Sequence, residues 1–500
     1  MAQPQAQALE ATGRPSIDGS ELEKAKQAQH VETDAVSTFE DPVEAKKIIR
    51  KIDFRLIPLL MFLYTLTFLD RVNIGNARLW NLEKDLHMTG YDYNIVVLVF
   101  YIPYILLEIP SNIILNHVTP RYWIGFLTLG WGLSVTFAGF SKSFGGLLAS
   151  RIFIGVFEAG MFPGCLFLIG SWYRRHELLT RMAWFMVSND IAGSISGLLG
   201  AGLGSLNGLR GYSGWSWIFF VEGAVTCCAA VLAFFYLPPF PEDAQFLKPE
   251  EKEWVIRRLK LDEQRRKDNE KMTIGGVIRC IINWKILTSG VLYLAVCVTA
   301  YSLSVFQPTV LKTFGWSSLK SNLLTTPVRV VSGIISVCVG IWSDKVQRRG
   351  IFCVVGFSIS IMGNLLVMLL KNGNLRYMGF YFASIGIYIC QPLVIAWCTN
   401  QIVGTTKRGT LTAFAISCGQ VGGIISAVVF PSKDGPQYVP GISTCIAFQA
   451  VGIMAAVNMW ACAAWENRQR DMGKRDSRRQ LSQDEQDKLG ELHPDFRYTL

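Results

Sequence analysis

The 500-residue chain is half hydrophobic, only 17% of its residues are charged, and its mean hydropathy is +0.30. This composition excludes an ordinary soluble domain and indicates a protein that lies in a lipid bilayer. The net charge of +10 does not indicate nucleic-acid binding, because the basic residues lie mostly in the tails and in alternate short loops.

Residues 1–45 are rich in Ala, Gln, Glu, Asp and Ser and lack the apolar segment of a signal peptide. We expect them to form a disordered cytoplasmic tail. Twelve apolar runs follow, each of about the 20 residues that are needed to cross the hydrocarbon core. The sequence therefore predicts an all-α polytopic membrane protein with twelve transmembrane helices, because the alternating strands of a barrel are missing from the pattern. The runs are approximately 56–74, 94–115, 122–140, 144–168, 182–206, 215–237, 286–307, 321–343, 351–371, 377–401, 408–430 and 443–465.

The distribution of basic residues predicts how the chain is oriented in the membrane. Lys and Arg cluster before the first run and after the fourth, eighth and tenth runs, as in Arg174, Arg175 and Arg181. The loops on the other side mostly carry fewer positive residues. Because cytoplasmic loops carry the excess of Lys and Arg, both termini are expected in the cytoplasm.

One long polar segment, about 238–284, divides the chain into two halves of six runs. Its stretch KPEEKEWVIRRLKLDEQRRK places acids before bases, an order that complements a helix dipole. We expect an amphipathic helix along the cytoplasmic leaflet, with a partner-binding site as the alternative. The expected domains are an N-terminal six-helix bundle, a cytoplasmic loop, a C-terminal six-helix bundle and a charged cytoplasmic tail, over residues 46–240, 241–284, 285–466 and 467–500.

Two pairs of opposite charges lie inside apolar runs. Asp70 and Arg71 are adjacent in the first run, and Arg151 and Glu158 are seven residues apart in the fourth. Charges in hydrocarbon usually face a protein interior or a water-filled pathway. Seven residues return to nearly the same helix face, whereas neighbours are about 100° apart. Arg151 and Glu158 should therefore face one space, while Asp70 points away from Arg71 and shares its face with Asn73.

These residue types suit proton-coupled anion transport. A guanidinium stays charged and can bind a carboxylate through two hydrogen bonds. A carboxylate in a cavity of changing polarity can take up and release a proton. Protonation of the acid then frees the Arg for the carboxylate of a substrate. The alternative is structural: Arg151 and Glu158 bridge helices, and Asp70 and Arg71 lie at the external water interface.

The loop after the eighth run, GIWSDKVQRRG, contains Gly340, Asp344, Lys345, Arg348 and Arg349. It resembles the G-x-x-x-D-K/R-x-x-R-R/K loop of the major facilitator superfamily, which ties neighbouring helices together at the cytoplasmic face. The loop after the second run, NIILNHVTPR, has the same spacing without the Asp and the basic residues. Its tie is therefore expected to be weaker or differently built.

Five further stretches resemble the anion:cation symporter branch of that superfamily, and more narrowly its fungal allantoate permease-type transporters: RLIPLLMFLYTLTFLDRVNIGNARL, LEIPSNIIL, RIFIGVFEAGMFPG, GSWYRRHE and WSWIFFVEG. The resemblance implies two bundles that alternate access to a central site, proton-coupled uptake of a small organic anion such as a carboxylate or vitamin acid, and a plasma-membrane location. It implies Asp70 and Glu158 as proton sites, Arg71 as the anion ligand and Arg151 as a partner that tunes Glu158. We expect a monomer without cofactor.

Other polar residues in the runs are candidate substrate contacts, with packing as the alternative: Asn73, Asp190, Tyr301, Gln307, Gln391, Asn400 and Gln401. We interpret Glu108 and Glu222 as structural residues. Arg329 either extends along the surface to external water or provides a second anion-binding group.

Two other functions stay open. The chain could export an acidic metabolite, because the fold does not fix the direction of transport. A polytopic membrane enzyme is the alternative from another class, but the sequence has no HExxH, no clustered His and no cofactor fingerprint, and no GxxxxGK[ST] for an ATP-driven pump. We therefore expect a secondary transporter rather than an enzyme.

Overall fold

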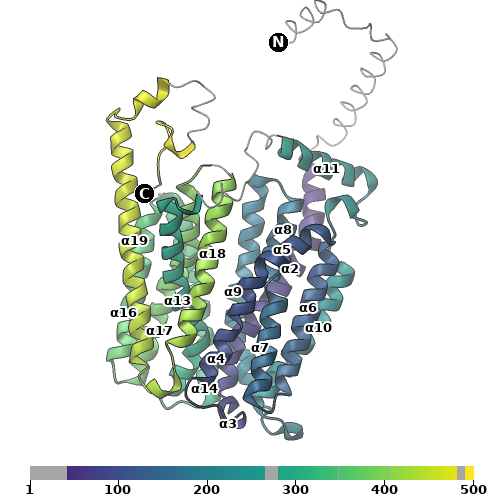
Figure 1. The fold of residues 1–500 in the computed structure, drawn as a ribbon, viewed down its shortest axis with the longest axis vertical. Coiled ribbons are helices and arrows are strands. Elements are labelled where there is room, and N and C mark those ends of the chain that lie inside the picture. Colours follow the sequence, from purple (N-terminus) through teal and green to yellow (C-terminus); the bar gives the residue numbers. More distant parts are fainter. Residues whose placement is uncertain (1–41, 265–279, 347, 404, 481–489, 500) are drawn as a thin grey trace, which may run out of the picture.

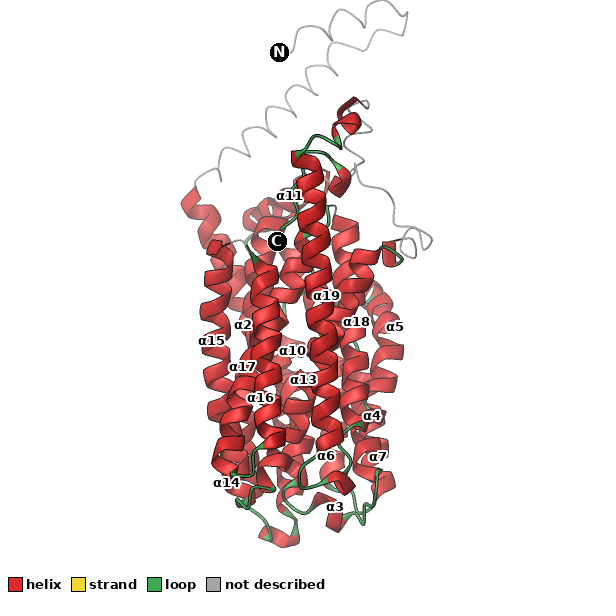
Figure 2. Ribbon diagram, turned by 90° about the vertical axis from the view of Figure 1, so that its left-hand side faces the viewer, coloured by secondary structure: helices red, strands yellow, loops and turns green. Residues whose placement is uncertain are grey.

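The computed structural model describes residues 42–264, 280–346, 348–403, 405–480 and 490–499, and every regular element in these ranges is helical (Figures 1 and 2). The tail predicted for residues 1–45 lies almost entirely outside them. Nine helical segments of the described residues are long and apolar enough to cross a membrane, so the predicted all-helical membrane architecture is confirmed, while the count of twelve stays a prediction. The nine are Glu44–Arg78, Phe144–Trp172, Gly214–Tyr236, Trp284–Lys312, Ser318–Val346, Arg349–Leu369, Gly373–Asn400, Lys407–Val428 and Val439–Asp471.

The first six apolar runs fall on the helices of an N-terminal half, in which α2 packs against α9 and α10, and α6 packs against α7 and α10. The second and fourth runs are each divided between two helices, α4 with α5 and α7 with α8. The helices are α2 (Pro42–Arg78), α3 (Leu82–Asp85), α4 (Asp92–Val99), α5 (Tyr101–His117), α6 (Pro120–Gly139), α7 (Phe144–Glu158), α8 (Met161–Trp172), α9 (Arg175–Gly204) and α10 (Gly214–Tyr236).

The other six runs form a C-terminal half, in which α16 packs closely against α17, and α13 against α18 and α19. Glycines allow this close approach: a Cβ on Gly363 would lie 2.1 Å from the backbone nitrogen of Ala383. The helices are α13 (Trp284–Lys312), α14 (Ser318–Leu323), α15 (Thr325–Val346), α16 (Arg349–Leu369), α17 (Gly373–Asn400), α18 (Thr405–Val428) and α19 (Val439–Asp471).

The helix predicted in the polar segment is α11 (Pro249–Gln264). It lies at the end of the molecule where α2 begins and α19 ends, which we call the terminal end (Figure 1). Lys51 on α2 forms a 2.7 Å ion pair with Glu251, and Arg258 pairs with Glu177 on α9. These contacts attach α11 to the N-terminal half.

The charged tail predicted from residue 467 onward is partly structured. Helix α19 continues to Asp471, and residues 490–499 pack back against the C-terminal half at the terminal end. The Tyr498 hydroxyl accepts a 2.8 Å hydrogen bond from Lys285, and the Thr499 carbonyl accepts one of 2.9 Å from Trp397. Basic composition alone did not indicate these contacts.

Contacts between the two halves gather at the opposite end, which we call the distal end. The Leu79 carbonyl accepts hydrogen bonds from Lys312 Nζ at 3.0 Å and from Ser318 Oγ at 2.8 Å. Asn94 on α4 donates to the carbonyl of Ala427 on α18. The structure therefore has the two halves packed together at the distal end.

Candidate functional site

The four charged residues of the two predicted pairs lie inside the N-terminal half. Asp70 and Arg151 are each 3% exposed, Glu158 is fully buried, and the side chain of Arg71 is 8% exposed. Asp70 and Arg71 are carried by α2, whereas Arg151 and Glu158 are carried by α7. Helix α7 ends at Glu158 and α8 begins at Met161, so the acid lies at a break between two helices.

Arg71 forms an ion pair with Glu158, in which Arg71 Nε donates to Glu158 Oε1. The guanidinium also lies over two aromatic rings, 5.2 Å from the centre of Phe100, which lies between α4 and α5, and 4.6 Å from that of Tyr104 on α5. Within the described residues, Arg71 Nη2 and Glu158 Oε2 have no hydrogen-bond partner. The pair thus keeps a free donor and a free acceptor.

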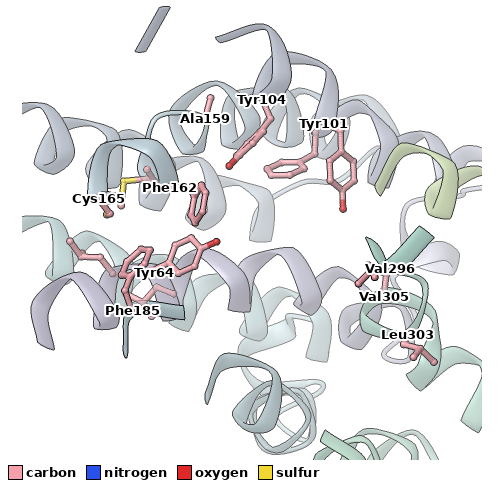
Figure 3. Packing of buried hydrophobic residues seen from close by; sticks show 14 of the residues in the cluster. Tyr64, Tyr101, Tyr104, Ala159, Phe162, Cys165, Phe185, Val296, Leu303 and Val305 are labelled. Carbon is pink, nitrogen blue, oxygen red and sulfur yellow. The ribbon is translucent and has the colours of Figure 1, made fainter. Parts of the chain in front are cut away.

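Tyrosines from both halves surround the Arg71 guanidinium. Tyr64 from α2 and Tyr301 from α13 are among its electrostatic neighbours, together with Tyr104. The Tyr101 and Tyr301 rings are 5.7 Å apart across the boundary between the halves. Figure 3 shows Tyr64 beside Phe185, on which its ring stacks, and the Tyr104 hydroxyl directed toward the helix that carries Tyr64. Arg71 is therefore placed where the two halves face each other.

Asp70 points into the N-terminal half, in the direction away from Arg71 that the helix geometry predicted. Its neighbours are Glu222 on α10, Trp131 on α6 and Arg151 on α7. Neither carboxylate oxygen of Asp70 has a hydrogen-bond partner among the described residues, and the same is true of Glu222. Asn73, on the same face of α2, lies beside Glu222.

Arg151 lies between the two acidic positions. Its guanidinium is 5.8 Å from the centre of the Phe219 ring, and its electrostatic neighbours include Asp70 and Glu158. Nε and Nη2 of Arg151 have no hydrogen-bond partner within the described part of the chain. Arg71, rather than Arg151, thus forms the direct ion pair with Glu158.

The other candidate contacts are dispersed. Tyr301 lies at the Arg71 site, and its hydroxyl donates a 3.1 Å hydrogen bond to Gln420. Gln391 and Asn400 are half-buried on α17, and Asn400 is the last residue of that helix. Asp190 lies on α9, and its side chain is outside the described part of the structure.

Two further glutamines lie away from Arg71. Gln307 is 2% exposed and lines a small cavity within the C-terminal half. Gln401 donates a 2.6 Å hydrogen bond to the Thr499 carbonyl at the terminal end. The structure therefore brings only Tyr301 from this polar set to the Arg71 guanidinium, as far as the described side chains show.

The loop motif of the C-terminal half ties three helices together at the terminal end. Arg349 Nη2 donates to Asp344 Oδ1 at 2.7 Å, and Arg349 Nη1 donates to the Ala396 carbonyl at 3.1 Å. These bonds join α15, α16 and α17, while Lys345 and Arg348 are exposed. Gly340 has open space around its Cα.

The N-terminal half has a different tie at the same end. Arg181 on α9 forms hydrogen bonds of 3.0 and 2.9 Å with the two carboxylate oxygens of Asp53 on α2. The side chains of Asn112 and Asn116, in the loop that matches the motif's spacing, lie outside the described residues. Sequence analysis assigned Arg181 only to a basic loop and did not single out Asp53.

Arg329 is 4% exposed and lies inside the protein, so the hypothesis that it extends along the surface is wrong for this structure. It donates to the Tyr388 hydroxyl at 3.2 Å and to the Ser304 carbonyl at 3.4 Å. A Cβ on Gly193 of α9 would lie 2.5 Å from Arg329 Nη1, which places the guanidinium against the N-terminal half.

The comparisons with known proteins agree with this architecture. Residues 60–427 match the Major Facilitator Superfamily. The MFS-type transporter cnsO of Penicillium expansum is 31% identical over 470 residues, which cover 91% of this chain and 90% of the relative. The major facilitator-type transporter hxnP of Emericella nidulans is 29% identical over 497 residues, which cover 98% of this chain and all of the relative.

Solved structures show the same fold. A bacterial homologue of the human lysosomal transporter Spinster, in an inward-facing and unoccupied conformation, matches with a TM-score of 0.64 and 17% identity over 80% of this chain and 95% of the other. A D-xylose–proton symporter matches with a TM-score of 0.59 and 14% identity over 81% and 97%. The chain is therefore a member of the Major Facilitator Superfamily, and it is a multi-pass membrane transporter rather than an enzyme.

Proposed function

We propose that this transporter takes up a small organic anion, such as a carboxylate or vitamin acid, together with a proton. It works by alternating access, as a monomer in the plasma membrane. The observation that carries the proposal is the Arg71–Glu158 ion pair, which is buried in the protein beside the boundary between the halves. A buried Arg paired with a titratable acid is the arrangement that lets an anion and a proton bind together.

The exchange of partners at Arg71 provides the coupling. In the described state, Glu158 holds Arg71 Nε while Arg71 Nη2 has no partner. A proton on Glu158 removes the charge that attracts the guanidinium. Arg71 can then bind the substrate carboxylate with two hydrogen bonds, which are among the stronger contacts in proteins. Asp70 is the second proposed proton site, and Arg151 lies between the two acids.

The rings around Arg71 favour a small organic anion over an inorganic one. Phe100 and Tyr104 hold the guanidinium on one side, and Tyr101 and Tyr301 approach from the two halves. Such walls contact the carbon skeleton of a substrate, while the hydroxyls can meet its polar groups. Resemblance to allantoate permease-type transporters in the sequence around Asp70, Arg71, Arg151 and Glu158 supports the same substrate class.

The packing of the two halves fits one state of an alternating-access cycle. They meet at the distal end through Leu79, Lys312 and Ser318. With both termini in the cytoplasm, as the loop charges predict, this state is closed to the outside. The anion and proton would then leave toward the cytoplasm, after which Glu158 pairs with Arg71 again.

Transport by the purified protein in liposomes tests the proposal. Labelled nicotinate, pantothenate, allantoate and sugar acids are offered with and without an inward proton gradient. We expect at least one of them to accumulate only with the gradient, and Asp70→Asn and Glu158→Gln each to lose that accumulation. Glu242→Gln, a substitution of an exposed carboxylate outside the helices that carry the site, is the matched control. Normal accumulation in both site variants, or gradient-driven exit of the anion, contradicts the proposal.

A further inference from the structure

Helix α10 brings a third buried acid to the charged cluster. Glu222 is 3% exposed, and its carboxyl group faces that of Asp70, which is also 3% exposed. All four oxygens of the two groups are buried and have no hydrogen-bond partner within the described residues. Two ionised carboxylates in this position have only acceptors to offer each other. A single proton between them supplies the missing donor.

Two buried hydrogen-bond donors lie beside this pair. The indole nitrogen of Trp131 neighbours Asp70, and the side chain of Asn73 neighbours Glu222. Trp131 and Asn73 are fully buried, and their side chains interact with the carboxyl groups of Asp70 and Glu222, respectively. Buried polar atoms are nearly always hydrogen-bonded. These donors and the two acids thus form one buried polar cluster.

The balance of charges around Asp70 and Glu222 also requires one proton. Asp70 and Glu222 face Arg151 on α7, and Asp70 also faces Glu158 on that helix. Glu158 is already paired with Arg71. The buried cluster therefore has three acids and two bases, and one added proton makes it neutral. Uncompensated charge in a low-dielectric interior is expensive, so the neutral arrangement is favoured.

Glu108 is the remaining acid near this cluster. It faces Arg71 from α5, but its side chain is only partly buried. Unlike the oxygens of Asp70 and Glu222, those of Glu108 are not enclosed without a hydrogen-bond partner. The negative charge that no base balances therefore belongs to Asp70 and Glu222.

We propose that Asp70 and Glu222 share one proton, so that Glu222 is a further proton-binding residue of the transporter, beside Asp70 and Glu158. Its effect on transport rests on the proposed proton coupling, whereas the shared proton itself does not. Each carboxyl group needs the other to keep the proton, because Arg151 favours the ionised form of whichever acid is left alone. Glu222 thus has a chemical role that its motif, FVEG, did not indicate.

Infrared spectroscopy of the purified, substrate-free protein at neutral pH tests the shared proton through the C=O stretch of protonated carboxyl groups. We expect Asp70→Asn and Glu222→Gln each to lose the same single-carboxyl band relative to wild type, and the double variant to lose no more. Glu222→Asp should retain the band, and Glu242→Gln should leave the spectrum unchanged. Unchanged bands in both single variants, or losses that add in the double variant, overturn the proposal.

Transport assays separate this inference from the proposed function. Glu222→Gln should lose proton-driven accumulation of the transported anion while it retains exchange of labelled for unlabelled anion, and Glu222→Asp should recover accumulation. A merely structural role of Glu222 would reduce accumulation and exchange together, and that result contradicts the inference. If wild-type protein shows the shared-proton band but no gradient-driven uptake, the proposed function fails and the pair stands.

Discussion

Replacing Gly197 with Ala should open the contact between the two halves at the distal end. Gly197 lies on α9 and faces α14 and α15 of the other half. A Cβ at this position would lie 2.5 Å from the Asn322 carbonyl oxygen and 2.3 Å from Thr325 Oγ1, whereas ordinary contacts are 3.4–4 Å. Because one of these atoms belongs to the backbone, a change of rotamer cannot relieve the clash. The helices must separate by roughly 1 Å.

The size of the effect follows from the cost of an overpacked contact, which is about 1–3 kcal/mol. This cost applies to the state in which the distal ends are packed together, and it disappears when they separate. The equilibrium should therefore shift toward the distally open state by about 5- to 150-fold. The gain in helix propensity from Gly to Ala is present in both states, so it cancels.

Labelling of a cysteine at position 322 measures this shift. Asn322 is fully buried at the contact, so an Asn322→Cys side chain should react with a membrane-impermeant maleimide on the distal side only when the halves separate. We expect Gly197→Ala to raise the labelling rate by the same factor. Gly202→Ala is the matched control, because it lies on the same helix with nothing within 4 Å of its Cβ. Equal labelling rates in Gly197→Ala and Gly202→Ala would refute the reasoning.

Four other substitutions test the contacts described above. When unlabelled carboxylates of the panel compete with uptake of the labelled anion, Arg71→Lys should raise the inhibition constant of the best one by about tenfold or more. The reason is that an ammonium cannot form two parallel hydrogen bonds to a carboxylate. An unchanged inhibition constant contradicts this role. Arg349→Ala should loosen α15 from α17 and speed amide hydrogen exchange there, and Asp344→Asn should do so less, since it leaves the bond to the α17 carbonyl intact. Burial is the largest single influence on the pKa of Glu251 and raises it, but the hydrogen bonds and charges of Lys51 and Lys248 together outweigh it and hold the pKa below its ordinary value. Glu251→Gln should therefore speed exchange in α11 at neutral pH, and the difference from wild type should vanish as the pH falls through the Glu251 pKa; a difference that persists in acid argues against the ion pair.

Much of the fold could be predicted because the bilayer imposes a minimum length on each apolar run. The positions at which a helix is interrupted inside one of these runs could not be predicted. Helix α7 ends at Glu158 and α8 begins at Met161, where a Cβ on Gly160 would lie 1.9 Å from Ser111 Oγ of α5. That interruption depends on a neighbouring helix, which the local sequence does not specify. The order of acids and bases did predict α11, because a helix dipole is a local property.

The sequence predicted which charged residues lie in the site, but not all of the partners that these residues contact. The 100° step between neighbours correctly separated Asp70 from Arg71, and the spacing placed Asn73 on the Asp70 side. The partner of Glu158 could not be derived, since only the assembled helix bundle decides between Arg71 on α2 and Arg151 on α7. Glu222 was interpreted as structural because a single acid in an apolar run shows no partner until the helices are assembled.

Proton uptake on substrate binding is the most direct test of the exchange at Arg71. The purified transporter is mixed with its best carboxylate in weakly buffered detergent solution that contains a pH indicator. If the substrate displaces Glu158 from Arg71 and Glu158 becomes protonated, wild-type protein takes protons from the medium on binding and Glu158→Gln does not. Binding without proton uptake in wild type, or equal uptake in Glu158→Gln, would contradict the account.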